Sequence, residues 1–191
     1  MTMDVDEKNM FLDLSQTLTG VRINSAGLPP PLGEAPRAKP GDLAPRNSPI
    51  DLASLYFDTV QVNGFGSVLD TALKEYSAHA VQDRNSYVRG CLLDPKSAQG
   101  ALFRSLIKLW YLGVWYPPSS ILALSPDETT PEAKPGWRRW RSLSHEVVSS
   151  QAYKEGLVWK IMQTHPMAYS MFTFGYWSEI PPPLDRFLST L

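Results

Sequence analysis

Apolar residues recur at intervals of three and four in several parts of this chain, the spacing of an amphipathic helix. The pattern predicts a first helix over residues 4–19, which ends at Gly20, and another over residues 67–80. Their apolar stripes contain Phe11, Leu14 and Leu18 in the first and Leu69, Ala72, Leu73 and Tyr76 in the other. Both helices are expected to bury these stripes in a shared core.

A helix between these two has its own start and stop signals. Ser48 is predicted to cap it, because a serine oxygen can accept a hydrogen bond from a free backbone N–H. Pro49 suits the first helical position, and Asp51 lies three residues after the cap. Asn63 and Gly64 are expected to end this helix.

The apolar pattern is clearest over residues 95–115, which are predicted to form one helix. One row of this helix contains Leu102, Leu106, Leu109 and Gly113. A glycine inside a helix is unfavourable, so Gly113 is expected to lie where another backbone approaches closely. The aromatic stretch 109–116 has two interpretations: a buried core helix, or a helix that also contacts a partner protein.

Two other segments have weaker helical patterns. Residues 84–94 predict a short helix, and the block that begins at Tyr153 and ends at Met162 predicts either a helix or a strand. The fold class is therefore mainly α: an irregular helical domain of about four to five helices, with residues 1–191 forming a single domain.

The chain has 17 prolines, and all except Pro95 fall in three clusters. Residues 27–49 and 117–145 are predicted to be long, Pro-rich extended loops, and residues 163–191 an aromatic and Pro-rich C-terminal arm. Loops of this length are unusual within one compact domain and often contact a partner.

Charge and composition exclude several classes of protein. The formal net charge is −1, so no overall field attracts the chain to nucleic acid or to an anionic membrane. No apolar run is long enough to span a bilayer. Cys91 is the single cysteine, which excludes an internal disulfide and a cysteine-built metal site. The N-terminal residues do not form a signal peptide.

Catalytic motifs are absent from the sequence. His145-Glu146 begins like a zinc-protease helix but lacks the second histidine four residues later. The basic and aromatic run 137–141, which contains Trp137 and Trp140, could stack on single-stranded nucleic acid. On a chain of neutral charge it fits better as a docking element for an acidic protein surface, because Arg and Trp are enriched at interface hot spots.

Three separated segments carry a family resemblance. They are residues 11–20 (FLDLSQTLTG), residues 106–114 (LIKLWYLGV) with the Trp-Tyr-x-Gly core, and residues 153–159 (YKEGLVW) followed by 175–181 (GYWSEIP). In this order they resemble the small (gamma) subunit of bacterial FAD-dependent sugar and polyol dehydrogenase complexes, of the glucose, fructose, sorbitol and glucoside-3 dehydrogenase type. The chain differs in having no twin-arginine export signal.

The resemblance implies an accessory subunit that is not an enzyme and binds no cofactor itself. A large flavoprotein of the glucose–methanol–choline (GMC) type would hold the FAD, and a third, cytochrome subunit would hold haem c. The small subunit would stabilise the flavoprotein and accompany its export to the periplasm, or to the membrane through the complex, if its leader was removed or the partner supplies one. Otherwise the expected location is the cytoplasm. The other interpretations are a free-standing helical binding domain and a small enzyme of unrecognised type.

Aromatic residues and one glycine are the candidate contacts with the partner, because they lie in the segments that carry the resemblance or in the basic run. These candidates are Trp110, Tyr111, Gly113, Trp137, Trp140, Tyr153, Trp159, Phe174, Tyr176 and Trp177. No catalytic, cofactor-binding or metal-binding residue is assigned in this chain.

Overall fold

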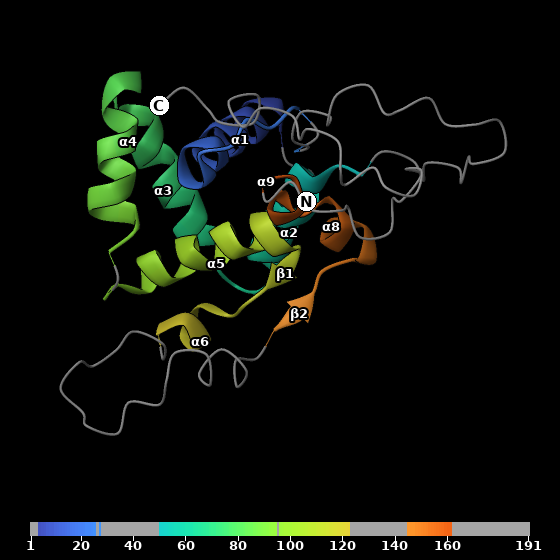
Figure 1. Cartoon of the computed structure of the whole chain (residues 1–191). Coiled ribbons are helices and arrows are strands. Elements are labelled where there is room, and N and C mark those ends of the chain that lie inside the picture. The colour runs from blue at the N-terminus through green and yellow to red at the C-terminus, as the bar shows by residue number, and fades with distance from the viewer. Residues whose placement is uncertain (1–3, 26, 28–49, 95, 123–144, 162–191) are drawn as a thin grey trace, which may run out of the picture.

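The fold is mainly α, as the sequence predicts (Figure 1). The computed structural model describes residues 4–25, 27, 50–94, 96–122 and 145–161. Its elements in order are α1 (Val5–Thr19), α2 (Leu52–Val62), α3 (Gly66–Ala78), α4 (Arg84–Tyr87), α5 (Ala98–Leu112), β1 (Val114–Trp115), α6 (Pro118–Leu122), β2 (Glu146–Val147), α8 (Ser150–Glu155) and α9 (Leu157–Ile161). In this part of the chain, the longest helices are α1, α2, α3 and α5.

Helix α1 has the ends that its sequence predicts. At the start, the Asp4 carboxylate accepts a hydrogen bond of 2.7 Å from the backbone N–H of Glu7. At the end, Gly20 has a φ of 70°, and its N–H donates to the Gln16 carbonyl. This left-handed conformation favours glycine, which has no Cβ to clash with its own backbone.

Helix α2 begins later than predicted, because Asp51 and not Ser48 caps it. The Asp51 carboxylate accepts hydrogen bonds from the Ser54 N–H and hydroxyl, and it also pairs with the Lys8 ammonium of α1. Burial by itself would raise the pKa of this carboxyl, but the hydrogen bonds from Lys8 and Ser54 outweigh it and lower the pKa. Ser48 and Pro49 lie outside the described residues.

The short helix predicted over residues 84–94 is present as α4 and a π-helical turn, Val88–Leu92. A polar cluster attaches it to α1 and α3. The Arg84 guanidinium donates to the Asp13 carboxylate at 2.6 Å, and the Tyr76 hydroxyl donates to the same oxygen at 3.0 Å. The Thr17 hydroxyl lies 2.8 Å from that of Tyr76.

Helix α5 is shorter than predicted at both ends. Its cap is Ser97, and it ends at Leu112, because Gly113 adopts a φ of 66° and terminates the helix. The next two residues form β1, which pairs with β2 in antiparallel register through Val114↔Val147 and Trp115↔Glu146. The prediction of a helix through residue 115 is therefore wrong.

Two other segments differ from a simple reading of their patterns. Pro118–Leu122, predicted as part of an extended loop, forms α6, which packs against α5. Proline is well tolerated in the first turn of a helix, where its missing N–H has no partner to lose. The block predicted as a helix or a strand forms two short helices, α8 and α9, which are separated at Gly156.

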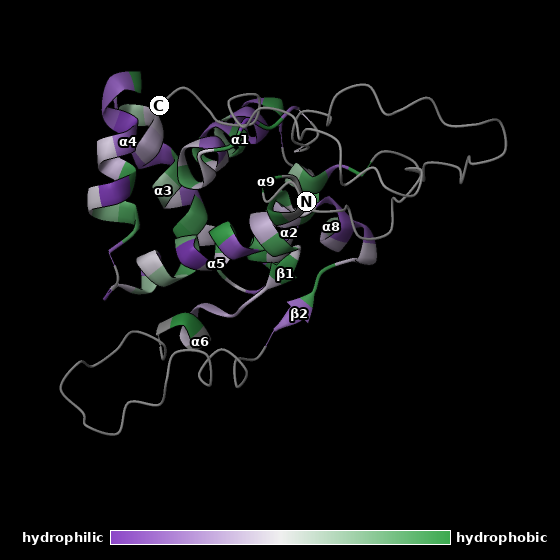
Figure 2. Cartoon of the chain, in the orientation of Figure 1, coloured by the Kyte–Doolittle hydropathy of each residue, from purple (hydrophilic) through white to green (hydrophobic). Residues whose placement is uncertain are grey.

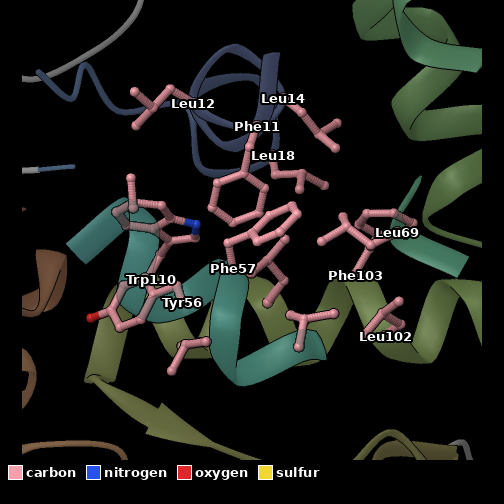
Figure 3. Packing of buried hydrophobic residues seen from close by; sticks show 14 of the residues in the cluster. Phe11, Leu12, Leu14, Leu18, Tyr56, Phe57, Leu69, Leu102, Phe103 and Trp110 are labelled. Carbon is pink, nitrogen blue, oxygen red and sulfur yellow. The ribbon is translucent and has the colours of Figure 1, made fainter. Parts of the chain in front are cut away.

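The core lies where α1, α2, α3 and α5 meet (Figures 1 and 2). The predicted stripes of α1, α3 and α5 are buried there with Leu52, Tyr56 and Val60 of α2, and Figure 3 shows side chains of α1, α2 and α5 in contact. Phe11 and Phe57 make a T-shaped, edge-to-face contact, with ring centroids 5.6 Å apart. Edge contacts between aromatic rings add to the stability that burial provides.

Candidate partner-binding site

The described parts of the three segments singled out in the sequence, residues 11–20, 106–114 and 153–159, meet at the end of α5. Residues 175–181 of the third segment lie outside the described residues. We call this place the junction and define it by Thr19, Tyr111, Gly113, Ala152 and Gly156. It joins the end of α1, the end of α5 and the helix pair α8–α9. The segments are distant in the sequence, so only the tertiary structure brings them together.

Tyr111 connects the first segment to the second. Its hydroxyl donates a hydrogen bond of 2.9 Å to the Thr19 carbonyl, one of the carbonyls at the end of α1 that no helical N–H can reach. The ring is only partly buried, and this burial raises the pKa of the hydroxyl. Tyr111 therefore fixes α1 to α5 and still presents part of its surface to solvent.

Gly113 connects the second segment to the third. A Cβ at this position would lie 2.5 Å from the carbonyl carbon of Ala152 and 2.5 Å from the nitrogen of Tyr153. The Gly113 carbonyl also accepts a hydrogen bond of 3.2 Å from the Val148 N–H. The predicted close approach of another backbone is confirmed, and the positive φ is a second, independent reason for glycine here.

Gly156 repeats this arrangement from the other side. A Cβ there would lie 2.6 Å from the Tyr111 carbonyl oxygen, so this position also has no room for a side chain. Gly113 and Gly156 therefore let the backbone at the end of α5 approach the backbone of the α8–α9 pair directly. Partly exposed side chains, which include Tyr111 and Tyr153, lie beside these contacts.

Trp110 is a core residue, which corrects its assignment to the partner interface. Only 1% of its surface is exposed, and its ring packs against Tyr56 at 4.7 Å and Phe11 at 6.2 Å between centroids (Figure 3). A face of a helix that is buried in this chain is not available to a second protein. The core interpretation of the aromatic stretch therefore holds for Trp110.

The remaining candidates divide by where they lie. Tyr153 is partly exposed at the start of the third segment. The backbone of Trp159 belongs to α9, but its side chain is not described. Five candidates lie outside the described residues: Trp137, Trp140, Phe174, Tyr176 and Trp177. The described candidates that the junction brings together and leaves partly exposed are thus Tyr111 and Tyr153.

The sequence gives no sign of a second group of side chains beside the junction. The Lys108 ammonium of α5 lies 5.5 Å from the centre of the Tyr116 ring, and this ring stacks on His145 with centroids 5.5 Å apart. Burial, and then the like charge of Arg104, lower the pKa of Lys108 to about 8. The spacing of Arg104 and Lys108 was visible in the sequence, but their aromatic neighbours were not.

The described residues contain no group of three or more His, Cys, Asp or Glu side chains arranged to hold a metal ion. A groove between α1 and α3 mixes charges of both signs with apolar side chains, and its lining is Glu7, Met10, Asp70, Leu73, Lys74 and Ser77. None of the candidate residues lies in it. None of the described helices is long and apolar enough to cross a membrane.

No protein-family model, curated protein or solved structure matches this chain. The functional argument therefore depends on its own residues and on the geometry of the junction.

Proposed function

We propose that this chain is the non-catalytic small subunit of an FAD-dependent sugar or polyol dehydrogenase complex. Its role is to bind and stabilise a large GMC-type flavoprotein, which holds the FAD. The observation that carries the proposal is the junction: the three segments that resemble the gamma subunit pack against each other through Tyr111, Gly113 and Gly156.

The contacts of the junction explain why these residue types would be needed together. Gly113 and Gly156 allow backbones to touch, and Tyr111 joins two helix ends with one hydrogen bond. A change to any of them would move the others, because each contact is between segments that are far apart in the sequence. The three segments that resemble the gamma subunit would therefore form one structural unit.

The proposal includes the location and the other subunits of the complex. The chain reaches the periplasm with its flavoprotein, or is held at the membrane through the complex, and a cytochrome subunit with haem c accepts the electrons. The chain itself contributes no group to the oxidation of the sugar, so the flavoprotein determines which sugar is used.

Co-expression with a GMC-type flavoprotein subunit from the same source tests the proposal. We expect a stable one-to-one complex with an interface of roughly 2,000 Å² or more, as in obligate complexes. FAD is expected in the complex and in the flavoprotein, and not in this chain when it is purified alone. The yield of active flavoprotein should fall when the chain is omitted.

Two results would contradict the proposal. The first is a soluble, monodisperse monomer that does not bind the flavoprotein, which would favour a free-standing binding domain. The second is flavin absorbance that stays with this chain through gel filtration, which would favour an enzyme.

A further inference from the structure

The groove between α1 and α3 shares no residue with the junction. Its lining is Glu7 and Met10 from α1, and Asp70, Leu73, Lys74 and Ser77 from α3. The groove has a volume of about 320 Å³, which is close to the lower limit of roughly 300 Å³ for small-molecule sites. A groove of this size suits an inserted side chain better than a large cofactor.

Two of the lining side chains are apolar. Leu73 is 4% exposed and belongs to the core, and Met10 packs against the same cluster while it stays partly exposed. The unbranched side chain of methionine adapts to different neighbours, and methionine is therefore common at binding surfaces. The groove thus offers an apolar contact to a side chain that enters it.

Two carboxylates of the groove lack a balancing cation within the described part of the chain. Glu7 on α1 and Asp70 on α3 are both partly buried, and neither belongs to an ion pair of the described residues. The hydrogen bond that Asp70 accepts from the Gln61 amide is long, at 3.4 Å. Removing a carboxylate from water costs free energy unless an opposite charge or hydrogen bonds compensate for it.

The charges of the lining favour a cation. Lys74 is exposed, so the described residues that line the groove have two carboxylates and one ammonium, a net charge of −1. Arg and Lys side chains can lay their apolar stems along an apolar surface while their charged ends bind carboxylates. A basic side chain therefore matches both the apolar and the acidic part of the groove.

We propose that the groove between α1 and α3 binds an Arg or Lys side chain on a segment of the flavoprotein subunit, with the charged end at Glu7 and Asp70 and the apolar stem on Met10. This inference rests on the proposed function and adds a second contact site to it. The site lies on the same helix, α1, whose end forms part of the junction. Contacts between opposite charges accelerate association and weaken as salt is added.

A pair of charge-matched double variants tests the groove. Glu7→Gln with Asp70→Asn should raise the dissociation constant for the flavoprotein about tenfold and flatten its dependence on salt. The control is Asp6→Asn with Asp58→Asn, which removes the same charge from two exposed carboxylates, and Asp6 lies in the same first turn of α1 as Glu7. The control should change the dissociation constant less than about threefold. Circular dichroism should show the same helix content for both.

The lysine of the groove gives a prediction of opposite sign. Lys74→Gln should lower the dissociation constant about twofold to threefold, because it removes a like charge near the incoming side chain. Lys96→Gln is the comparison, since it neutralises another exposed lysine outside the groove and should leave the dissociation constant unchanged. A weaker complex with Lys74→Gln would indicate an anionic occupant and would overturn the proposal.

Carboxyl labelling of the wild-type complex does not depend on the variants. A carbodiimide with glycine ethyl ester modifies accessible carboxylates, so Glu7 and Asp70 should be labelled in the chain alone and protected in the complex. Asp6 and Asp58 should be labelled in both states.

The outcomes separate this contact site from the proposed function. Equal labelling of Glu7 and Asp70 with and without the flavoprotein, or equal dissociation constants for the two double variants, would overturn the groove as a contact site and leave the proposed function standing. Protection of the same carboxylates in a concentrated solution of this chain alone would assign the groove to a second copy and would also overturn the proposal. A wild-type chain that does not bind the flavoprotein would overturn both.

Discussion

Gly20 and Gly113 have almost the same backbone conformation but different surroundings. Both end a long helix, with φ values of 70° and 66°. A Cβ at Gly20 would meet nothing within 4 Å, whereas at Gly113 it would collide with the backbone of Ala152 and Tyr153. Substitutions at these two glycines therefore separate the free-energy cost of a side chain in the left-handed conformation from the cost of a steric clash.

We predict that Gly113→Ala destabilises the chain more than Gly20→Ala does. Gly20→Ala should lower the free energy of unfolding by about 1 kcal/mol, the cost of a side chain in the left-handed region. Gly113→Ala should cost about 2–4 kcal/mol, because overpacking adds its own 1–3 kcal/mol. Pulse proteolysis in urea would measure both, with or without the partner. Equal losses would mean that the Ala152 backbone moves away freely.

Two buried tyrosines differ in whether their hydroxyl has a hydrogen-bond partner. Tyr76 shares its hydroxyl with Asp13 and Thr17, while the Tyr56 hydroxyl is buried without a hydrogen-bond partner in the described part of the chain. Burial, and then the charge of Glu155, raise the pKa of Tyr56, so its hydroxyl stays neutral. A buried polar group without a partner costs free energy.

Removing each hydroxyl should therefore have opposite effects. Tyr56→Phe is expected to leave the stability unchanged or to raise it by up to about 2 kcal/mol, since no hydrogen bond is lost. Tyr76→Phe should lower it by about 1–2 kcal/mol, because Asp13 loses one of its donors. Thermal unfolding of the two variants and of the wild type measures these differences in stability. A clear loss for Tyr56→Phe would indicate that an ordered water satisfies this hydroxyl.

Between elements, Asp51 has two separable functions. It caps α2 through Ser54, and it joins α2 to α1 through Lys8. Asparagine caps a helix about as well as aspartate, so Asp51→Asn removes the ion pair and leaves the cap. Lys8 and Asp51 are 24% and 42% exposed, which limits the contribution of the pair to a fraction of its value in a dry interior.

The pH dependence of this variant identifies the charge effect. The folded-state pKa of Asp51 lies below its ordinary value of 3.8, so its stabilisation is complete well above that value. It is lost as the pH falls through the lowered pKa, where the carboxyl becomes neutral. We expect Asp51→Asn to cost less than about 1 kcal/mol at pH 7, and nothing at pH 2. A cost that does not change between these pH values would assign it to the cap.

We expect Trp110 to stabilise helix α5 by packing in the core of this chain, and to contribute less through contact with a partner. Trp110→Ala should destabilise the chain itself by about 3–5 kcal/mol, as for other large aromatic residues that leave a cavity. Trp110→Phe, which keeps the contacts with Phe11 and Tyr56, should cost less. Urea unfolding would distinguish them. If Trp110→Ala unfolds like the wild type but binds the flavoprotein weakly, Trp110 belongs to the interface with the flavoprotein and not to the core.

For the whole molecule, the C-terminal arm, residues 163–191, is a further segment that we expect to contact the flavoprotein. Its aromatic residues, which include Phe174, Tyr176 and Trp177, lie outside the described residues. Clustered aromatic side chains promote aggregation when they are exposed to water. The same side chains contribute strongly to the binding energy when a partner protein covers them. The alternative is that they close the core of this chain.

We predict that Trp177→Ala weakens the complex with the flavoprotein by about 2 kcal/mol or more and keeps the helix content. Trp115→Ala is the matched comparison, because Trp115 is 2% exposed and should lose helical structure when truncated. Titration of the complex and far-ultraviolet circular dichroism measure the two effects. Loss of the helical signal in Trp177→Ala, with normal binding by the folded fraction, would place the arm in the core.

The sequence by itself determined the helical class and the buried faces of the long helices. Hydrophobic periodicity identified the stripes of α1, α2, α3 and α5, because a helix in water must bury its apolar side. Local signals also placed the ends of α1, since Asp4 and Gly20 act within one turn of the residues they cap. Hydrophobic periodicity and helix-end residues act between positions that are close in the sequence, so each helix can be recognised from its own segment.

Only the tertiary structure decided where the segments meet. The close approach of Gly113 to Ala152, the β1–β2 pair and the ion pair of Asp51 with Lys8 each join residues more than 30 positions apart in the chain. The same holds for Tyr111 with Thr19, and Tyr116 likewise meets His145 from a distant part of the chain. The physical reason is that close packing and ion pairing are set by neighbours in space, and local periodicity carries no record of them.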